Sequence, residues 1–255
     1  MKKVKLFVAT LALALSTSAS AAFITIGTST GGIYDVDTDT GVATELIAGG
    51  IGPFMTDLAR DASGNLWGVT FGNLYSIDTS TDTFTNKGSL GASGMNALTF
   101  NGGTLYGSSF SSSDLYTINT TTGLASSQGK GGHVSSGDLA FDAAGIMYLL
   151  ADTGTDDTLV SVNPSNGATS EIGSGTGIDF AYGLAFVDSV MYAVSSAGVL
   201  YTVDTVNGSL GPPKNILGIT GAVYGATTSL VPVPATVWLF ASGMLGLLGF
   251  SRKRQ

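Results

Sequence analysis

The stretch Leu200-Tyr-Thr-Val-Asp-Thr-Val-Asn-Gly208 decides the fold, because the chain repeats its pattern four more times. Each copy begins with apolar or aromatic residues that alternate with polar ones, and it ends in a small polar turn closed by Gly, or by Asp82 in one copy. The second positions of the copies are residues 34, 75, 116, 160 and 201, so successive units lie 41, 41, 44 and 41 residues apart. A period of this length indicates five copies of one structural unit.

In four of the units, two further strand-like runs separated by a small turn come before the repeated segment. They are residues 57–61 and 65–69, 97–101 and 104–108, 138–142 and 146–150, and 183–187 and 190–194. Each unit is therefore predicted to form four short strands joined by tight turns, which is the pattern of a β-propeller blade. We predict an all-β fold, a five-bladed β-propeller with blades of about 41 residues.

The first unit lacks the first strand of its blade. The chain's earliest strand-like run, residues 23–26, occupies the second-strand place of that unit. Counting onward from Tyr201 by the spacing of the other units reaches Tyr224, inside a strand-like run at 219–227. We expect this C-terminal strand to complete blade one and close the ring, because an unpaired sheet edge favours aggregation.

The charge of the repeat region limits its partners. Residues 22–230 hold all 18 acidic residues but only Arg60, Lys87, Lys130 and Lys214 of the basic ones, so their net charge is −14. This argues against nucleic acid and anionic lipid, which need a basic face. There is no cysteine, so disulfides and Cys-based metal sites are excluded. We expect one propeller domain over 22–230, stabilised by its core, with no cofactor and no metal.

The N-terminus has the pattern of a secretory signal peptide. Three lysines precede an apolar run at 6–15, which is too short to span a bilayer, and small residues follow at Ala19 and Ala21. We predict a signal peptide at 1–21 that is cleaved after Ala21. The protein would then be exported across the inner membrane through the Sec translocon.

The C-terminus contains an apolar run at 235–250 followed by the basic residues Arg252, Lys253 and Arg254. A helix of this length reaches roughly 24 Å at 1.5 Å per residue, slightly less than the ~30 Å hydrocarbon core, so it spans with snorkelling. The positive-inside rule keeps the basic residues in the cytoplasm and places the body of the protein outside. We predict a transmembrane helix at about 235–250 and a basic tail at 252–254.

The segment 231–255 resembles the PEP-CTERM sorting signal of Gram-negative bacteria. The matching features, in order, are Val231, Pro232, Pro234, Ala235, Trp238, the apolar run and the basic tail. The sequence departs from the family at Val233, where the acidic residue that gives the motif its name usually stands. The resemblance implies recognition by an exosortase-type membrane protease, transient anchoring, and release to a cell surface or biofilm matrix with exopolysaccharide. An ordinary C-terminal anchor without processing is the alternative.

Candidate site residues are few. Asp57 and Asp138 occupy equivalent positions just before two first strands, and a propeller brings such positions together at its axis. Two converging carboxylates can act as acid and base or bind a cation. The other blades hold Ala97 and Gly183 there, however, and Asp is also common where a loop enters a strand. The single histidine, His133, is insufficient for a His-based metal site, and we expect an exposed loop residue.

Other repeated residues have structural interpretations. The segment 35–41 is similar to a calcium loop, but its Gly comes one residue late and the bidentate acidic residue is missing, so we predict a self-capping hairpin turn instead. Aromatic residues recur at fixed strand positions, which indicates packing between blades. These are Tyr34, Tyr75, Tyr116, Tyr201, Trp67, Tyr106, Tyr148 and Tyr192. The inserts 108–114 and 152–158 should lie on one rim, where recognition is most plausible.

Two functional hypotheses remain. The first is an exported, non-catalytic protein of the cell surface or extracellular matrix, whose propeller interacts with extracellular polysaccharide or surface proteins. The second is a secreted propeller hydrolase, of glycosidase or lactonase type, that uses axial carboxylates or calcium. The scarcity of His and Glu in the body favours the first, and we expect no catalytic activity.

Overall fold

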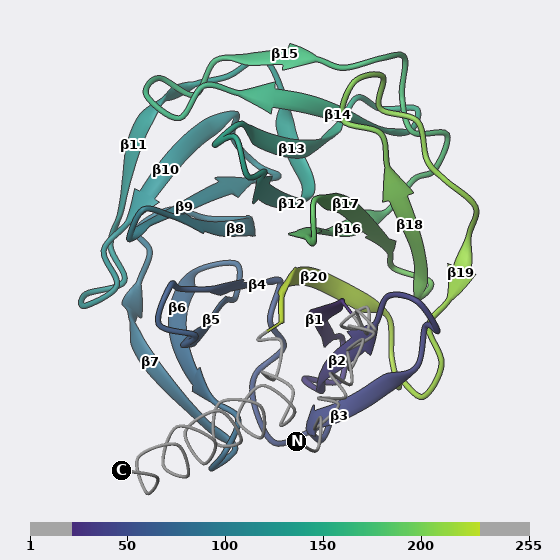
Figure 1. Ribbon diagram of the computed structural model, residues 1–255. Helices are drawn as coiled ribbons and strands as arrows, with labels where there is room; N and C mark the ends of the chain where they lie inside the picture. Colours follow the sequence, from purple (N-terminus) through teal and green to yellow (C-terminus); the bar gives the residue numbers. More distant parts are fainter. Residues whose placement is uncertain (1–21, 230–255) are drawn as a thin grey trace, which may run out of the picture. The chain divides into compact units, whose positions relative to one another are not determined.

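The computed structural model describes residues 22–229, which form twenty β-strands. The strands make five antiparallel sheets of four strands each, arranged as blades around one axis (Figure 1). The predicted five-bladed propeller is thereby confirmed. Within the described residues, no helix is long and apolar enough to cross a membrane. The predicted signal peptide, sorting motif, transmembrane helix and basic tail lie outside the described residues.

Each blade runs from an inner strand at the axis to an outer strand at the rim. Blade one is β20 (Val223–Thr228), β1 (Phe23–Thr28), β2 (Ile33–Asp37) and β3 (Ala43–Ile47). Blade two is β4 (Asp57–Arg60), β5 (Leu66–Val69), β6 (Asn73–Asp78) and β7 (Thr83–Ser89), and blade three is β8 (Met95–Asn101), β9 (Thr104–Ser109), β10 (Asp114–Ile118) and β11 (Ala125–Lys130). Blade four is β12 (Val134–Phe141), β13 (Met147–Asp152), β14 (Asp157–Val162) and β15 (Thr169–Glu171), and blade five is β16 (Ala181–Val187), β17 (Val190–Ser195), β18 (Val199–Val203) and β19 (Lys214–Asn215).

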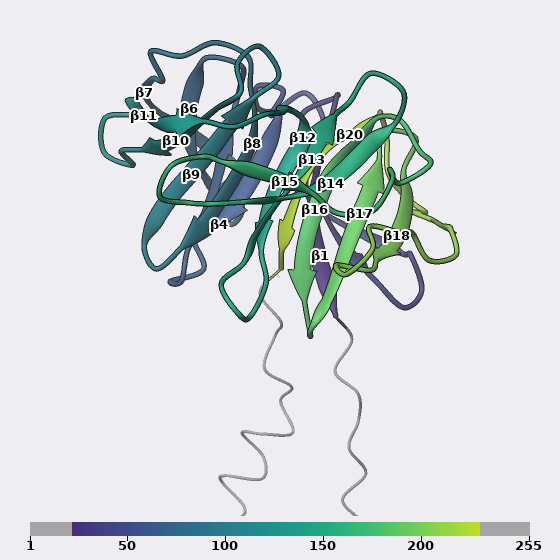
Figure 2. The ribbon, with the colours of Figure 1, turned by 90° about the horizontal axis from the view of Figure 1, so that it is seen from above.

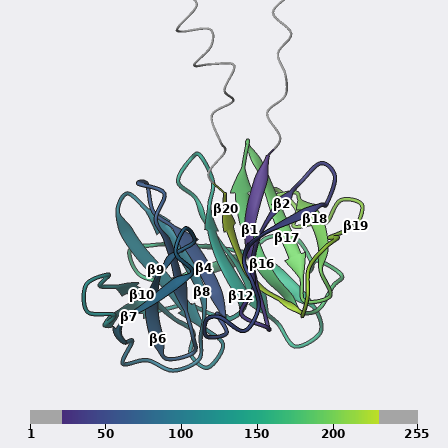
Figure 3. The same cartoon turned by 90° about the horizontal axis from the view of Figure 1, so that it is seen from below.

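The ring is closed by β20, which pairs antiparallel with β1 (Figures 2 and 3). The predicted C-terminal clasp is therefore confirmed, although its register differs from the count. Ala226, not Tyr224, occupies the place of Leu58, because Ala226 pairs with β1 as Leu58 pairs with β5. The strand begins at Val223 instead of 219, and its register differs because the bulge places the extra residue Gly225 between Tyr224 and Ala226.

The core lies between the blades. The buried apolar residues form five clusters, and each cluster joins two adjacent blades. Seven of the eight repeated aromatic residues belong to these clusters: Tyr34 and Tyr148 are buried, and Trp67, Tyr75, Tyr106, Tyr116 and Tyr192 pack against them, whereas Tyr201 is half-buried and belongs to none. Burial of apolar surface between blades thus stabilises the ring, and the interpretation of these aromatic residues as packing residues is confirmed.

The five repeated turns cap themselves. The side-chain oxygen of Asp or Asn accepts the N–H two residues further on at 2.8–2.9 Å, at Asp37, Asp78, Asn119, Asn163 and Asp204. The last residue of each turn is left-handed, with φ between 52° and 78°. Gly takes this conformation without steric cost. The turn interpretation is confirmed over the calcium loop.

Replacing Asp82 by glycine should stabilise the protein. Asp82 has a φ of 52° at the turn position where the other four copies have Gly. Relief of a left-handed conformation gains about 1–2 kcal/mol, which exceeds the roughly 0.5–1 kcal/mol entropic cost of a new glycine. We expect Asp82→Gly to raise the free energy of unfolding by about 0.5–1 kcal/mol, measured by urea denaturation. Gly123→Ala at the equivalent turn should lower it, and an unchanged or lower value for Asp82→Gly would contradict the argument.

Candidate functional site

A pocket of about 340 Å³ opens at one end of the propeller axis. It lies at the face where the five inner strands begin, and we call it the axial pocket and this face the pocket face. The pocket is lined by residues of all five blades. The volume suits a small ligand or the end of a chain. At the opposite face, β1 begins and β20 ends, and Ser229 N–H donates to Phe23 O at 3.1 Å.

One inner-strand position supplies a pocket residue from every blade. It lies two residues before Leu58, Leu98, Leu139, Leu184 and Ala226, and holds Thr56, Asn96, Gly137, Tyr182 and Tyr224. In four of the five inner strands, the pairing register shifts at or beside this position. Bulges redirect side chains and often occur beside functional sites. In these four blades a bulge therefore lies where the inner strand supplies its pocket residue, and Thr56 of blade two occupies the same position without a bulge.

Aromatic side chains form a continuous series along the pocket mouth, which we call the aromatic chain. Ring centroids are 5.5 Å apart for Phe110–Phe71, 6.3 Å for Phe71–Phe54, 4.6 Å for Phe54–Tyr224, 5.0 Å for Tyr224–Tyr182 and 5.9 Å for Tyr182–Phe180. Phe71, Phe110 and Phe180 are 45%, 51% and 53% exposed. Phe180 also has a left-handed φ of 61°. Grouped exposed aromatic residues and local backbone strain both indicate a binding site.

Three carboxylates line the axial pocket, and no basic side chain does. Asp152 and Asp179 are exposed, whereas Asp157 is buried. Burial raises the pKa of Asp157 to about 6, and the charges of Asp179 and Asp152 act in the same direction. The hydrogen bonds from Ser136 and from the Ala181 N–H oppose this rise. Asp157 therefore carries a negative charge at neutral pH and loses it in mild acid.

Two buried polar atoms beside the pocket have no hydrogen-bond partner within residues 22–229. They are Oδ1 of Asn96 and Oγ of Ser135, and both residues line the axial pocket. The Asn96 amide is oriented by its Nδ2, which donates to Ser136 O at 2.9 Å. An unpaired buried polar group costs about 1–3 kcal/mol, so such groups usually mark a site that is completed by another molecule.

The structure brings together the two predicted axial carboxyl groups, Asp57 and Asp138. Both are fully buried, one residue further along the inner strands than the pocket residues. Asp57 accepts the N–H groups of Leu58 and Leu98. Asp138 accepts those of Leu139, Leu184 and Ala226. The pair thus connects inner strands of all five blades by hydrogen bonds.

Burial raises the pKa of both Asp57 and Asp138 well above the usual range. The negative charge of Asp138 raises the pKa of Asp57 further, and a hydrogen bond joins the two side chains. The pair therefore shares a proton, which supplies this hydrogen bond. This arrangement gives the pair a structural task, and neither carboxyl group reaches the pocket surface.

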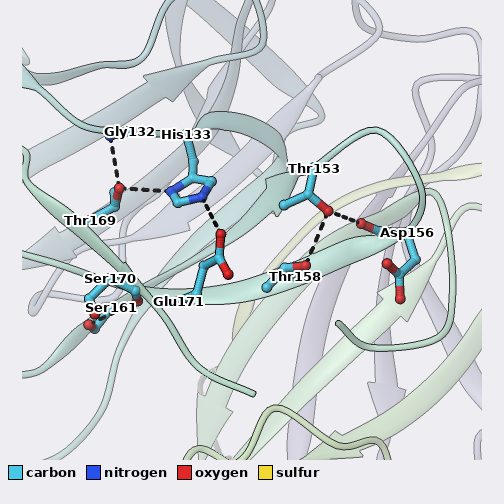
Figure 4. A network of polar contacts seen from close by, with 9 residues as sticks. All are labelled: Gly132, His133, Thr153, Asp156, Thr158, Ser161, Thr169, Ser170 and Glu171. Atoms are coloured by element: carbon cyan, nitrogen blue, oxygen red, sulfur yellow. Dashed lines mark hydrogen bonds and ion pairs between the residues drawn. The ribbon is translucent and has the colours of Figure 1, made fainter. Parts of the chain in front are cut away.

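His133 is held in place, in contrast to the exposed loop residue expected. Its Nδ1 lies 2.9 Å from Oγ1 of Thr169, and its Nε2 lies 3.0 Å from Oε1 of Glu171 (Figure 4). These contacts link the connection between β11 and β12 to the outer strand β15. His133 is not among the residues that line the axial pocket, and its contacts give it a structural role.

Both inserts, 108–114 and 152–158, contribute residues to the axial pocket, in agreement with the expectation that they lie on one rim. The first supplies Phe110, and the second supplies Asp152 and Asp157. The second insert is also ordered internally, since Oγ1 of Thr153 donates to Asp156 O at 2.9 Å (Figure 4). The aromatic chain, Asp179 and the unpaired Asn96 were not predicted from the sequence. One sequence signal could have indicated some of the pocket residues. Phe71, Phe110 and Asp152 each follow the aromatic residue of a second strand by four positions.

Comparison with known proteins adds the fold but no family. No protein-family model and no curated protein matches this chain. A chain of the crystal structure of a nidogen/laminin complex is similar with a TM-score of 0.56 and 10% sequence identity, over 82% of this chain and 99% of that one. A protein of unknown function from Bacteroides caccae matches at a TM-score of 0.45 and 12% identity, over 80% and 77% of the two chains. Kuenenia stuttgartiensis hydrazine synthase matches at 0.46 and 12%, over 63% and 48%.

Proposed function

We propose that this protein is an exported, non-catalytic binding protein of the cell surface or extracellular matrix, and that its axial pocket binds an extracellular polysaccharide. The aromatic chain beside the pocket carries this proposal. Exposed aromatic faces bury the apolar faces of sugar rings. The carboxylates and the unpaired Asn96 oxygen accept hydrogen bonds from hydroxyl groups. A pocket lined by aromatic residues with few polar groups is typical of small-ligand recognition.

The proposed route to the surface rests on the two ends of the sequence. A signal peptide at 1–21 directs Sec export, and the PEP-CTERM-like segment 231–255 anchors the protein until an exosortase-type protease cleaves it. The geometry of the propeller supports this route, because the chain enters and leaves the ring at the face opposite the pocket. An attachment through either end leaves the pocket face open to a ligand.

One observation favours a second candidate, a secreted hydrolase. Asp157 lies in the pocket, and its pKa of about 6 suits a carboxyl group that acts as general acid near neutral pH. Asp57 and Asp138 are enclosed by backbone donors and serve this alternative less well. Cleavage of the polysaccharide by the wild type, lost in Asp157→Asn, would identify the hydrolase.

The proposal is tested in the native host with two full-length proteins, the wild type and a Phe110→Ser/Phe180→Asn variant. Both residues are about half exposed, and Asn tolerates the left-handed φ of residue 180, so the variant should fold. We expect the wild type in the polysaccharide matrix, with an intact mass that begins at Ala22 and ends near residues 231–236. The variant should have the same mass but move to the supernatant, because it has lost stacking surface.

Each half of the proposal has its own contradicting result. Wild type that retains Gln255 in the membrane fraction contradicts processing by a sorting protease. A variant that stays in the matrix like the wild type contradicts binding through the axial pocket. Val206→Ser is the matched control, since Val206 is 86% exposed and lies outside the pocket lining. It should behave as the wild type does.

A further inference from the structure

We infer that the ligand of the axial pocket carries a protonated amine, so that the preferred polysaccharide contains amino sugars with free amino groups. This inference rests on the proposed function and specifies its ligand class. The negative charge of the pocket lining favours a cationic ligand. Asp152, Asp157 and Asp179 line the pocket without a basic side chain to neutralise them. An ammonium group is the complement that such a site favours, by ion pairing and charge-assisted hydrogen bonds.

The unsatisfied groups also require a ligand that donates hydrogen bonds. Oδ1 of Asn96 is a carbonyl oxygen and can only accept, and the amide orientation is fixed because Nδ2 donates to backbone carbonyl groups. The carboxylates have accepting capacity beyond the N–H groups of Gly154, Ala181 and Phe180 and the Ser136 side chain that they already bind. An ammonium group offers three donors and no acceptor. Hydroxyl groups of a neutral sugar also donate to these acceptors, but they leave the charge of the carboxylates uncompensated.

The aromatic chain favours an organic cation over a metal ion. The Tyr182 and Tyr224 rings stack at 5.0 Å beside the carboxylates, and aromatic faces attract ammonium groups through the ring quadrupole. Within residues 22–229, no three carboxylate or histidine side chains lie close enough to hold a metal ion. A sugar ring with an amino group fits both the aromatic chain and the carboxylates. The apolar face of the sugar contacts the aromatic rings, and its ammonium group faces the carboxylates.

The test is calorimetric titration of the full-length protein, purified from its host, with three tetrasaccharides of one backbone type. They are a glucosamine tetramer, an N-acetylglucosamine tetramer and a glucose tetramer. We expect the glucosamine tetramer to bind at least about tenfold more tightly than either neutral one, a difference of about 1.4 kcal/mol in binding free energy. Asp152→Asn/Asp179→Asn should abolish this preference. Both residues are exposed, so the folded state should be kept.

A matched control removes the same charge elsewhere. Asp39→Asn/Asp188→Asn alters two exposed residues outside the pocket lining, and it should keep the preference. Acid should weaken binding of the glucosamine tetramer as pH falls through about 6, because Asp157 is then protonated. The other titratable groups near Asp157 are Asp152, Asp179, Tyr182 and Tyr224. Asp157→Asn should remove the part of this pH dependence due to Asp157.

The outcomes separate this inference from the proposed function. Equal binding of all three tetramers, reduced by Phe110→Ser/Phe180→Asn, overturns the amine inference and retains the polysaccharide-binding function. Failure of all three tetramers, and of the host's own polysaccharide, to bind overturns both. A preference that persists in Asp152→Asn/Asp179→Asn and in Asp157→Asn also overturns the assignment of the amine to these carboxylates.

Discussion

Replacing Asp138 by alanine is expected to lower the free energy of unfolding by about 3–5 kcal/mol, because each buried N–H group left without an acceptor costs about 1–3 kcal/mol. The side chain accepts the N–H groups of Leu139, Leu184 and Ala226 and shares a hydrogen bond with Asp57. All of these donors are buried, and water has no access to replace the carboxylate. Urea denaturation of the wild type and the variant measures the difference.

The backbone of this position tolerates alanine, since Ala97 occupies it in blade three. The expected loss therefore comes from the missing hydrogen bonds. Asp39→Ala, in the exposed turn after β2, is the surface control and should change stability by less than about 0.5 kcal/mol. A loss below about 1 kcal/mol in Asp138→Ala, the size of one ordinary hydrogen bond, would show that the pair does not hold the inner strands together.

The pH dependence of the free energy of unfolding gives a second test of the role of Asp138. Burial raises the pKa of Asp138 in the folded protein above the unfolded value of about 3.9. The stabilisation linked to its proton is thus fully present below about pH 3.9 and is lost as pH rises through the folded pKa. The deficit of Asp138→Ala should therefore be largest in acid and shrink as pH rises. A deficit that grows with pH would contradict the raised pKa.

Replacing Gly225 by alanine is expected to cost roughly 4 kcal/mol, the sum of left-handed strain and a steric clash. Gly225 has a φ of 73° and is the extra residue of the bulge where β20 pairs with β1. A Cβ here would lie 2.5 Å from the Cα of Asp57 and still closer to its Oδ1. The substitution therefore pushes the closing strand away from blade two. Thermal and urea unfolding of the purified variant measures the effect.

Gly145→Ala separates the two causes. Gly145 has a φ of 80°, and a Cβ there would meet nothing within 4 Å. Its replacement should cost about 1–2 kcal/mol, which is the conformational part alone. Equal losses in the two variants would show that the close approach of β20 to Asp57 contributes nothing. A larger loss at Gly225 assigns the remainder to that contact.

The blade count and the clasp could be predicted because both follow from local pattern. Alternation along each strand and the self-capping turns recur with one period, and period plus length leaves room for five units. The register of β20 could not be predicted in the same way. The count assumes a regular strand, whereas Gly225 is an extra residue in the bulge of β20, and Ala226 stands where Tyr224 was expected. The bulge depends on the pairing of β20 with β1, which the repeat does not encode.

The axial pocket could not be predicted from the sequence, and the reason is physical. A repeat reveals what the blades share, whereas a binding site in a ring is built from what differs between them. Thr56, Asn96, Gly137, Tyr182 and Tyr224 occupy one structural position with five different residue types. The convergence of Asp57 and Asp138 could be anticipated because both are Asp at equivalent positions. Their enclosure by backbone N–H groups required the packed inner strands.

The clasp between β20 and β1 also dictates the order of assembly. During synthesis, β1 emerges among the first residues of the propeller, but its inner neighbour is the last strand to appear. Blade one therefore stays incomplete, with β1 as an open edge, while blades two to five form from contiguous segments. Ring closure depends on a contact between distant parts of the chain, which is the kind of contact that slows folding. A chain interrupted before Val223 thus leaves every blade but the first whole and the ring open.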